Sequence, residues 1–229
     1  MNYEIVTPYA RIYATPHTPT GVQLLQDCEY FGRVSHWTEE RQGPDSYKRF
    51  ISDVVMNKGD LSIIQHVSLS VEAVVDRGVA DEWVRHRIGA YTMRSTRFVN
   101  YAKENTQHEL VNPIGFICPP KIAADADMFF EWKSTRTETI EEYQYYINRG
   151  ESPEIARNCL PLCIATKLIA TYNLHMWRYF FLMRTTRNAH PQMRTIATSL
   201  LEEFKNYIPI IFDDIVPNST QKHNLTLLH

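Results

Sequence analysis

The densest group of chemically active side chains lies between Arg85 and Arg97. This stretch contains four arginines, a histidine and Ser95 within 13 residues. Guanidinium groups bind phosphate oxygens well because they offer two parallel, charge-assisted hydrogen bonds. Ser95 and neighbouring backbone N–H groups could complete a cradle for an anion. Taken alone, a cluster of this kind is more often a solvated basic surface, with a phosphate-binding segment as the alternative.

A second group of arginines occupies the C-terminal half of the chain. Its members are Arg157, Arg178, Arg184, Arg187 and Arg194. Arg184 ends an apolar helical run, where a cation stabilises a helix by about 0.3–1 kcal/mol. That effect alone would explain Arg184. If the two arginine groups converge in the fold, however, their ligand carries several negative charges, as a nucleotide does.

The charge of the whole chain limits the ligands that these arginines serve. The 229 residues carry a formal net charge of -2 at pH 7, whereas nonspecific DNA-binding proteins are strongly basic. We therefore expect no nucleic-acid partner. The chain has no apolar run of about 18 residues and no export signal, so we expect a cytoplasmic protein without membrane contact.

The cysteines show no metal-binding or disulfide pattern. Cys28, Cys118, Cys159 and Cys163 form no CxxC pair and have no zinc-site spacing. Free cysteines of this kind are usually buried and inert. We therefore expect reduced structural thiols and no metal site.

The elements that must position these side chains follow from hydrophobic periodicity and capping residues. Thr20 and Ser46 are expected N-caps, and Gly78 is expected to break a strand. We expect helices near residues 21–32, 46–58, 80–87, 121–132, 136–149, 173–184 and 189–206, a short helix at Glu154 and Arg157, and strands over 67–75 and 160–172. This pattern favours one α+β domain over residues 1–216, followed by a loose tail over 217–229.

Several segments carry spacing patterns that are specific as a set. Arg85-His86-Arg87 is followed, after seven residues, by Ser95-Thr96-Arg97. Glu154 lies three residues before Arg157, and Leu160-Pro161 follows. Further segments of the set are Arg33-Val34-Ser35, Gln65-His66, Asn173 to Arg184 and the helix from Ala189. Together they resemble the flavin-dependent thymidylate synthases, over about residues 20 to 212.

The resemblance implies a fold and an activity. The family has its own α+β fold, a mixed sheet flanked by long helices, and forms a homotetramer with FAD at the subunit interfaces. Methylenetetrahydrofolate would supply one carbon to C5 of dUMP, giving dTMP, and NADPH would be the usual reductant. The host would be a bacterial cell or a phage-infected cell.

The resemblance also implies roles for individual residues. Arg184 would lie against the pyrimidine and polarise it for attack at C5, as the catalytic residue. The residues implied to contact the nucleotide are Glu82, Arg94, Ser95, Arg97, Glu154, Arg157 and Arg184. The residues implied to contact FAD are Ser35, His66, Ser68, Arg85, His86, Arg87, Asn173, His175 and Tyr179.

Some positions depart from the family pattern and leave alternatives open. Glu82 replaces a usual glutamine, Met93 a usual Glu or Gln, His175 an arginine and Tyr179 an asparagine. A carboxylate at Glu82 would suit an exocyclic amine, so a dCMP hydroxymethylase on the same scaffold is the main alternative. A catalytically dead flavin-binding relative and a nucleic-acid-binding module are the others.

Overall fold

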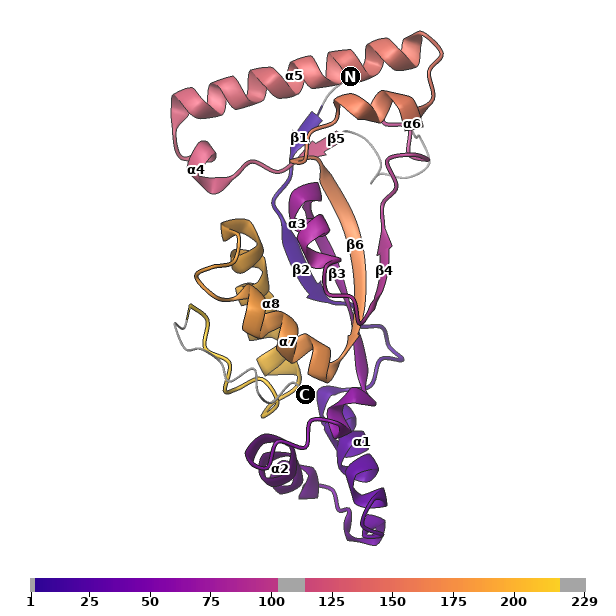
Figure 1. Cartoon of the computed structure of the whole chain (residues 1–229), viewed down its shortest axis with the longest axis vertical. Coiled ribbons are helices and arrows are strands. Elements are labelled where there is room, and N and C mark those ends of the chain that lie inside the picture. Colours follow the sequence, from indigo (N-terminus) through magenta and orange to yellow (C-terminus); the bar gives the residue numbers. More distant parts are fainter. Residues whose placement is uncertain (1–2, 103–113, 219–229) are drawn as a thin grey trace. The chain divides into compact units, whose positions relative to one another are not determined.

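The structure is a computed structural model that describes residues 3–102 and 114–218 (Figure 1). It mixes helices and strands, which confirms the expected α+β class. The chain divides into two compact units. The first comprises residues 1–9, 73–85 and 92–168, and the second comprises residues 10–72, 86–91 and 169–229. The expectation of one domain over residues 1–216 therefore stays a prediction, and residues 219–229 of the expected tail lie outside the described part.

Four strands form the larger sheet, in the order β2-β3-β6-β4. Their bounds are β2 (Tyr9–Ile12), β3 (Ser68–Asp76), β6 (Ala165–Asn173) and β4 (Ala90–Met93). In β3, Leu69, Val71, Ala73 and Val75 are all buried. This alternation fixes which face of the strand packs inward.

The first unit is built around a short parallel pair of strands and a long helix. β1 (Tyr3–Ile5) pairs with β5 (Ile114–Phe116), and Figure 1 shows α5 passing across this pair. The helices of the unit are α3 (Arg77–Trp83), α4 (Pro120–Ala123), α5 (Ala126–Asn148) and α6 (Pro153–Ala156), followed by a 3-10 turn at Arg157–Cys159. Tyr101, Phe116 and Tyr143 lie in its buried core.

The second unit packs helices around an aromatic core. Its helical segments are α1 (Gly21–Val34), a 3-10 turn (Glu39–Arg41), α2 (Ser46–Phe50) continued by a π-helix (Ile51–Asn57), a 3-10 turn (Ile63–Gln65), α7 (Leu174–Arg184) and α8 (Pro191–Tyr207). Trp177 and Phe181 of α7 pack against Phe204 of α8, with ring centroids 5.0 Å from Phe204 in both cases. Large buried aromatic surfaces of this kind dominate the stability of a core, so α7 is firmly anchored.

Several expected elements are confirmed. Thr20 caps α1 through a reciprocal capping box with Gln23, β3 spans the expected strand, and α7 and α8 lie close to the expected helices. Among the described residues, none of the helices combines the length and apolar composition that crossing a membrane requires.

Other expectations about local structure were wrong. Gly78 does not break β3, because Asp76 caps α3 by accepting a hydrogen bond from the Val79 amide at 2.7 Å, which places Gly78 inside the helix. The helices expected at 121–132 and 136–149 are α4 and one long α5. Helix α5 runs without a break through the expected gap at 133–135, where the Thr135 hydroxyl donates to the Glu131 carbonyl at 3.0 Å.

Two boundaries were also wrong. Ser46 does not cap α2, since Asp45 is the N-cap residue, and the Ser46 hydroxyl instead donates to Glu29 at 2.7 Å. The strand expected from Leu160 begins only at Ala165 because Ile164 closes a turn onto the Pro161 carbonyl. The short strands β1, β2, β4 and β5 had not been expected.

Candidate functional site

Helix α7 is the element that positions the central site residues of the second unit. Asn173 is its N-cap and accepts a hydrogen bond from the Met176 amide at 2.8 Å. The Leu174 amide donates to the Val67 carbonyl at 2.9 Å, which fixes the start of the helix. Arg184 is its last residue. A strong cap at one end and a buried aromatic face therefore determine where the Arg184 side chain begins.

Arg184 is hydrogen-bonded to His86, which lies 98 residues earlier in the chain. Arg184 Nε donates to His86 Nε2 at 2.9 Å. Because a guanidinium can only donate, His86 Nε2 must accept, and the ring proton must lie on Nδ1. Burial and the positive charge of Arg184 lower the pKa of His86 to about 4. His86 is therefore a neutral imidazole at pH 7, with only 5% of its surface exposed.

The lowered pKa of His86 predicts that the folded protein loses stability in acid. In the unfolded chain its pKa is 6.5, whereas the folded chain holds its pKa near 4. Below pH 6.5 the histidine of the unfolded chain binds a proton that the folded chain does not bind, so the free energy of unfolding falls. The fall reaches about 3 kcal/mol by pH 4, and above pH 6.5 this loss is absent. We expect the free energy of unfolding, measured with urea, to fall less between pH 7 and 4.5 in His86→Gln than in the wild type. Equal losses in both proteins would contradict a buried neutral His86.

A second histidine, at the start of α7, is held in the same way. The carboxamide nitrogen of Gln65 lies 2.9 Å from His175 Nδ1. Because the Gln65 carboxamide nitrogen donates, His175 Nδ1 accepts, and the ring proton of neutral His175 lies on Nε2. Burial, and then the charge of Arg178, lower the pKa of His175. Arg178 itself is a structural residue, because it forms a two-pronged ion pair with Asp214 at 2.7 Å.

The two histidines share an unusual property. His86 Nδ1 and His175 Nε2 are both buried, and neither has a hydrogen-bond partner among the described residues. Buried polar groups nearly always have a partner, and an exception asks for an explanation. Two buried N–H donors of this kind suit a ligand that presents hydrogen-bond acceptors.

A cavity of about 470 Å³ in the second unit contains two of the expected FAD residues, His66 and Ser68. The Phe31 ring lies 5.2 Å from the His66 ring and lines the same cavity. Tyr13 and His17 also line it. Aromatic rings and small polar groups together are typical of pockets that bind planar organic ligands.

The first unit brings a separate set of expected residues together. Arg97 forms an ion pair with Glu154 at 3.0 Å, and Arg157 Nη1 donates to Thr96 at 3.2 Å. The Ser95 hydroxyl accepts from the Arg97 amide at 3.1 Å. Segments 57 to 61 residues apart in the chain thus meet. We call Arg97, Arg157 and Ser95 the cationic group of the first unit.

The backbone of the same segment is held by a residue that sequence reasoning did not select. Arg77 Nη1 donates to the Arg94 carbonyl at 3.2 Å, and the Arg94 amide donates to the Lys167 carbonyl at 2.9 Å. Arg94 therefore lies at a fixed backbone position beside the Ser95 turn. Nothing in the local pattern of the sequence distinguishes Arg77 from an ordinary surface cation.

The remaining expected residues have less specific surroundings. Ser35 ends α1, and its hydroxyl lies 2.7 Å from His36 Nδ1. Glu82 is half-buried in α3, while Arg85 and Arg87 are exposed. Tyr179 places its ring edge-on to His86, with centroids 5.7 Å apart.

Comparison with known proteins places these features in a family. The family model for thymidylate synthase complementing proteins matches residues 22–210. The chain belongs to this family. Its similarity to individual members is spread over most of both chains. The chain is 32% identical to the flavin-dependent thymidylate synthase of Pyrococcus furiosus over 202 residues, 84% of this chain and 77% of that protein.

Two further relatives of the same name show similar coverage. The flavin-dependent thymidylate synthase of Pyrococcus abyssi is 30% identical over 187 residues, 78% of this chain and 73% of that protein. That of Geobacter sulfurreducens is 27% identical over 210 residues, 91% of this chain and 86% of that protein. Identity at this level makes the chain a divergent member of the thymidylate synthase complementing proteins.

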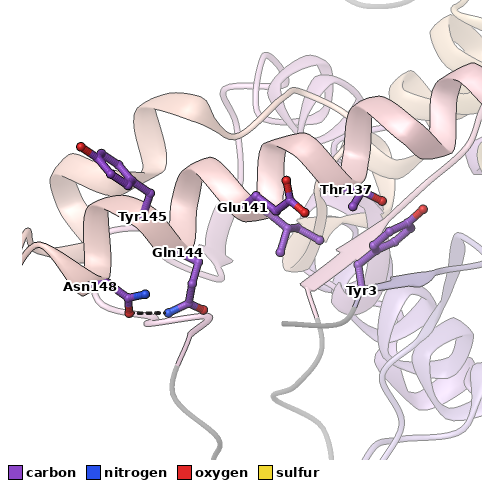
Figure 2. Close-up of a pocket in the computed structure, with 7 residues that line it drawn as sticks. Tyr3, Thr137, Glu141, Gln144, Tyr145 and Asn148 are labelled. Atoms are coloured by element: carbon purple, nitrogen blue, oxygen red, sulfur yellow. Dashed lines mark hydrogen bonds between the residues drawn. The ribbon is translucent and has the colours of Figure 1, made fainter.

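Another cavity of this family member is lined by none of the expected site residues. It has a volume of about 560 Å³ and is lined by Tyr3 and by residues of α5 (Figure 2). Gln144 and Asn148 on its wall bond to each other at 2.8 Å. Although it is larger than the cavity at His66, it contains no expected cofactor or nucleotide residue. Side-chain chemistry therefore favours the smaller cavity as the candidate site.

The backbone of the Arg85-His86-Arg87 turn depends on a glycine of this family member. A Cβ on Gly89 would lie 2.2 Å from the Tyr172 ring, and Tyr172 is fully buried. We expect Gly89→Ala to lower the free energy of unfolding by about 1–3 kcal/mol, because overpacking forces the ring or the turn to move. Thermal and urea unfolding would measure this loss.

Gly43→Ala is the matched control for this substitution. A Cβ on Gly43 meets nothing within 4 Å, and Gly43 is not among the glycines with a positive φ. The control should keep the stability of the wild type within about 0.5 kcal/mol. If both variants unfolded at the same denaturant concentration, close packing of Gly89 on Tyr172 would be refuted.

Proposed function

We propose that this chain is a flavin-dependent thymidylate synthase, which transfers a one-carbon unit from methylenetetrahydrofolate to C5 of dUMP and yields dTMP. The observation that carries the proposal is the hydrogen bond between Arg184 and the neutral, buried His86, in a chain that belongs to the thymidylate synthase complementing proteins. The names of the relatives support the same activity. FAD is the proposed cofactor and NADPH the proposed reductant.

The residues of the second unit fit FAD. The isoalloxazine ring of a flavin is planar and carries carbonyl oxygens and ring nitrogens that accept hydrogen bonds. The unpartnered N–H groups of His86 and His175 are donors suited to such an acceptor edge. The proposed FAD-contacting residues are Ser35, His66, Ser68, Arg85, His86, Arg87, Asn173, His175 and Tyr179, and all of them except Arg85 belong to the second unit. When bound and reduced, the flavin would supply the hydride of this chemistry, with NADPH as the proposed source of the electrons.

Arg184 is the proposed catalytic residue. C5 is nucleophilic when the pyrimidine carries enolate-like negative charge on its carbonyl oxygens, and a guanidinium against the base would stabilise that charge. The neutral His86 accepts a hydrogen bond from Arg184 Nε. It therefore orients the guanidinium without repelling its positive charge. A protonated His86 could not accept this hydrogen bond and would repel Arg184.

The cationic group of the first unit is the proposed site for the nucleotide phosphate. Arg97, Arg157 and Ser95 supply the charge and hydrogen bonds that a phosphate monoester requires. Arg94, Glu82 and Glu154 complete the proposed nucleotide-binding set. Glu154 pairs with Arg97 here, so a bound phosphate would have to displace or share that guanidinium.

The wider family properties enter as further proposals. We propose the fold of the flavin-dependent thymidylate synthases, a single catalytic domain over residues 1–216, a homotetramer with sites at the subunit interfaces, and a cytoplasmic location in a bacterial or phage-infected cell. The exposed side chains of Tyr30, Phe31, Val34 and Trp37, at or just after the end of α1, could take part in subunit contacts.

A product assay by mass spectrometry tests the proposed reaction. Purified protein, FAD, NADPH and methylenetetrahydrofolate would be incubated with an equal mixture of dUMP and dCMP. Methylated dUMP as the main product would support the proposal. Hydroxymethylated dCMP would instead establish the alternative that the Glu82 and Met93 departures suggested. Flavin binding without turnover of either nucleotide would indicate a catalytically dead relative.

A further inference from the structure

The turn that carries His86 is held by two tyrosine side chains that no expected site contains. The Tyr91 hydroxyl bonds to the main-chain carbonyl of His86, and it also bonds to the Tyr172 hydroxyl. The two tyrosine rings meet edge-on, with centroids 5.8 Å apart. Tyr91 is the second residue of β4 and Tyr172 lies near the end of β6, so two neighbouring strands of the sheet hold one turn.

The direction of these hydrogen bonds follows from the groups themselves. A carbonyl can only accept, so the single hydroxyl proton of Tyr91 goes to the His86 carbonyl. The Tyr172 hydroxyl must then donate to the Tyr91 oxygen. The result is an ordered chain from Tyr172 to Tyr91 to the backbone of His86.

The anchor of this chain cannot move easily. The Tyr172 ring is 1% exposed and packs at 4.4 Å, centroid to centroid, on the Trp177 ring of α7. The turn lies directly on it, since the Gly89 Cα carries no side chain and a Cβ there would overlap the Tyr172 ring. Closely packed interiors transmit such constraints because they have few voids to absorb a shift.

We propose that Tyr91 and Tyr172 are positioning residues of the active site, which fix the backbone of His86 so that its imidazole accepts from Arg184 in the productive orientation. The inference deepens the proposed function and rests on it for the role of Arg184. It assigns a role to two residues that belong neither to the proposed nucleotide-binding set nor to the proposed FAD-contacting set.

The surroundings of His86 define a measurement that reports on this positioning directly. The titratable and charged groups that face it are Arg184 and Tyr179 from α7, Tyr172 from β6, and Tyr91 through the backbone. The packed turn keeps the imidazole dry beside a cation, and this environment lowers its pKa to about 4. If the turn loosens, water reaches the ring and the pKa must rise toward 6.5.

The test uses Tyr91→Phe in the full-length protein, with Tyr207→Phe as the matched control. The Tyr207 hydroxyl also donates to a backbone carbonyl, that of Pro19, at 2.7 Å in the same unit. NMR of ring-labelled histidine would give the pKa of His86, and the His86→Gln variant would assign its signal among the 9 histidines. Steady-state kinetics with dUMP would give kcat and KM.

We expect three results for Tyr91→Phe. The pKa of His86 rises by one unit or more, kcat falls by about 10- to 100-fold because Arg184 is misplaced, and KM for dUMP stays within about twofold. Tyr207→Phe should leave all three values as in the wild type. Tyr172→Phe should match Tyr91→Phe if it folds, and Tyr91→Phe, at a half-buried position, decides the question if it does not.

The outcomes separate this inference from the proposed function. An unchanged His86 pKa in Tyr91→Phe would overturn the positioning role whatever the activity. An unchanged kcat would overturn it as well. If the wild type converts no dUMP while the His86 pKa still moves in Tyr91→Phe but not in Tyr207→Phe, the positioning of His86 holds and the proposed reaction fails.

Discussion

Replacing Arg184 with lysine is expected to reduce kcat by about 10²- to 10³-fold, the loss typical when one preorganised donor to a developing negative charge is removed. Lysine keeps the positive charge, but it lacks the planar fork and the Nε–H that Arg184 gives to His86 at 2.9 Å. The charge would then be free to point away from the base. Single-turnover assays of dTMP formation would measure the loss.

The fold of the variant should be intact, because α7 is held by its Asn173 cap and its aromatic face rather than by Arg184. FAD affinity, measured by fluorescence titration, should therefore change little. Arg187→Lys is the matched control, since Arg187 is an exposed arginine just after the same helix. Activity of Arg184→Lys within a factor of three of the control would rule out the proposed catalytic role.

The sequence predicted the anchoring of the site better than its assembly. The helix expected over 173–184, with Arg184 at its end, is confirmed by α7, although the cap at Asn173 had not been predicted. The same holds for Thr20 and α1. Local rules work here because capping and helical periodicity depend on residues that are only three or four positions apart.

The long-range contacts between the candidate site residues could not be predicted in this way. Arg184 meets His86 across 98 residues and Arg157 meets Thr96 across 61, and each requires the pairing of strands in a sheet. The strand that carries Tyr91 spans only Ala90–Met93, too short for a periodicity signal. The family motif covers the loop that carries His86, but it gives no reason for Tyr91 or Tyr172, because their contact with the turn depends on packing against Gly89.

The placement of the arginines shows how a chain with a net charge of -2 could bind the proposed polyanionic ligands. Arg178 and Arg33 are used inside the second unit, where they pair with Asp214 at 2.7 Å and with Glu29 at 2.6 Å. Arg97 pairs with Glu154 on a half-exposed surface instead, where a pair is worth only about 0.2–1 kcal/mol. A phosphate could displace such a carboxylate at little cost, so the proposed phosphate site of the first unit would remain stable without its ligand.

Arg157→Met is expected to raise KM for dUMP by about 10- to 100-fold, since each hydrogen bond to a charged group contributes about 1.5–3 kcal/mol. The kcat should change less than about threefold, because the phosphate does not react and its binding is the same in the ground and transition states. Initial rates over a range of dUMP concentrations, at fixed salt, would measure both constants. Arg149→Met is the control in the same unit, as Arg149 stacks over the Tyr145 ring at the end of α5.

A second substrate shows whether the lost interaction is with the phosphate. Deoxyuridine lacks the phosphate, so Arg157→Met should reduce the preference for dUMP over deoxyuridine by the same factor by which it raises KM. Thr96→Val removes the hydroxyl that Arg157 bonds at 3.2 Å while keeping the guanidinium, and its effect should be several-fold smaller. Two results would contradict phosphate binding: an equal rise in KM for dUMP and deoxyuridine in Arg157→Met, or a rise in KM for dUMP in Thr96→Val as large as that in Arg157→Met. Either result would show that Arg157 supports the turn at Ser95 and does not bind the phosphate.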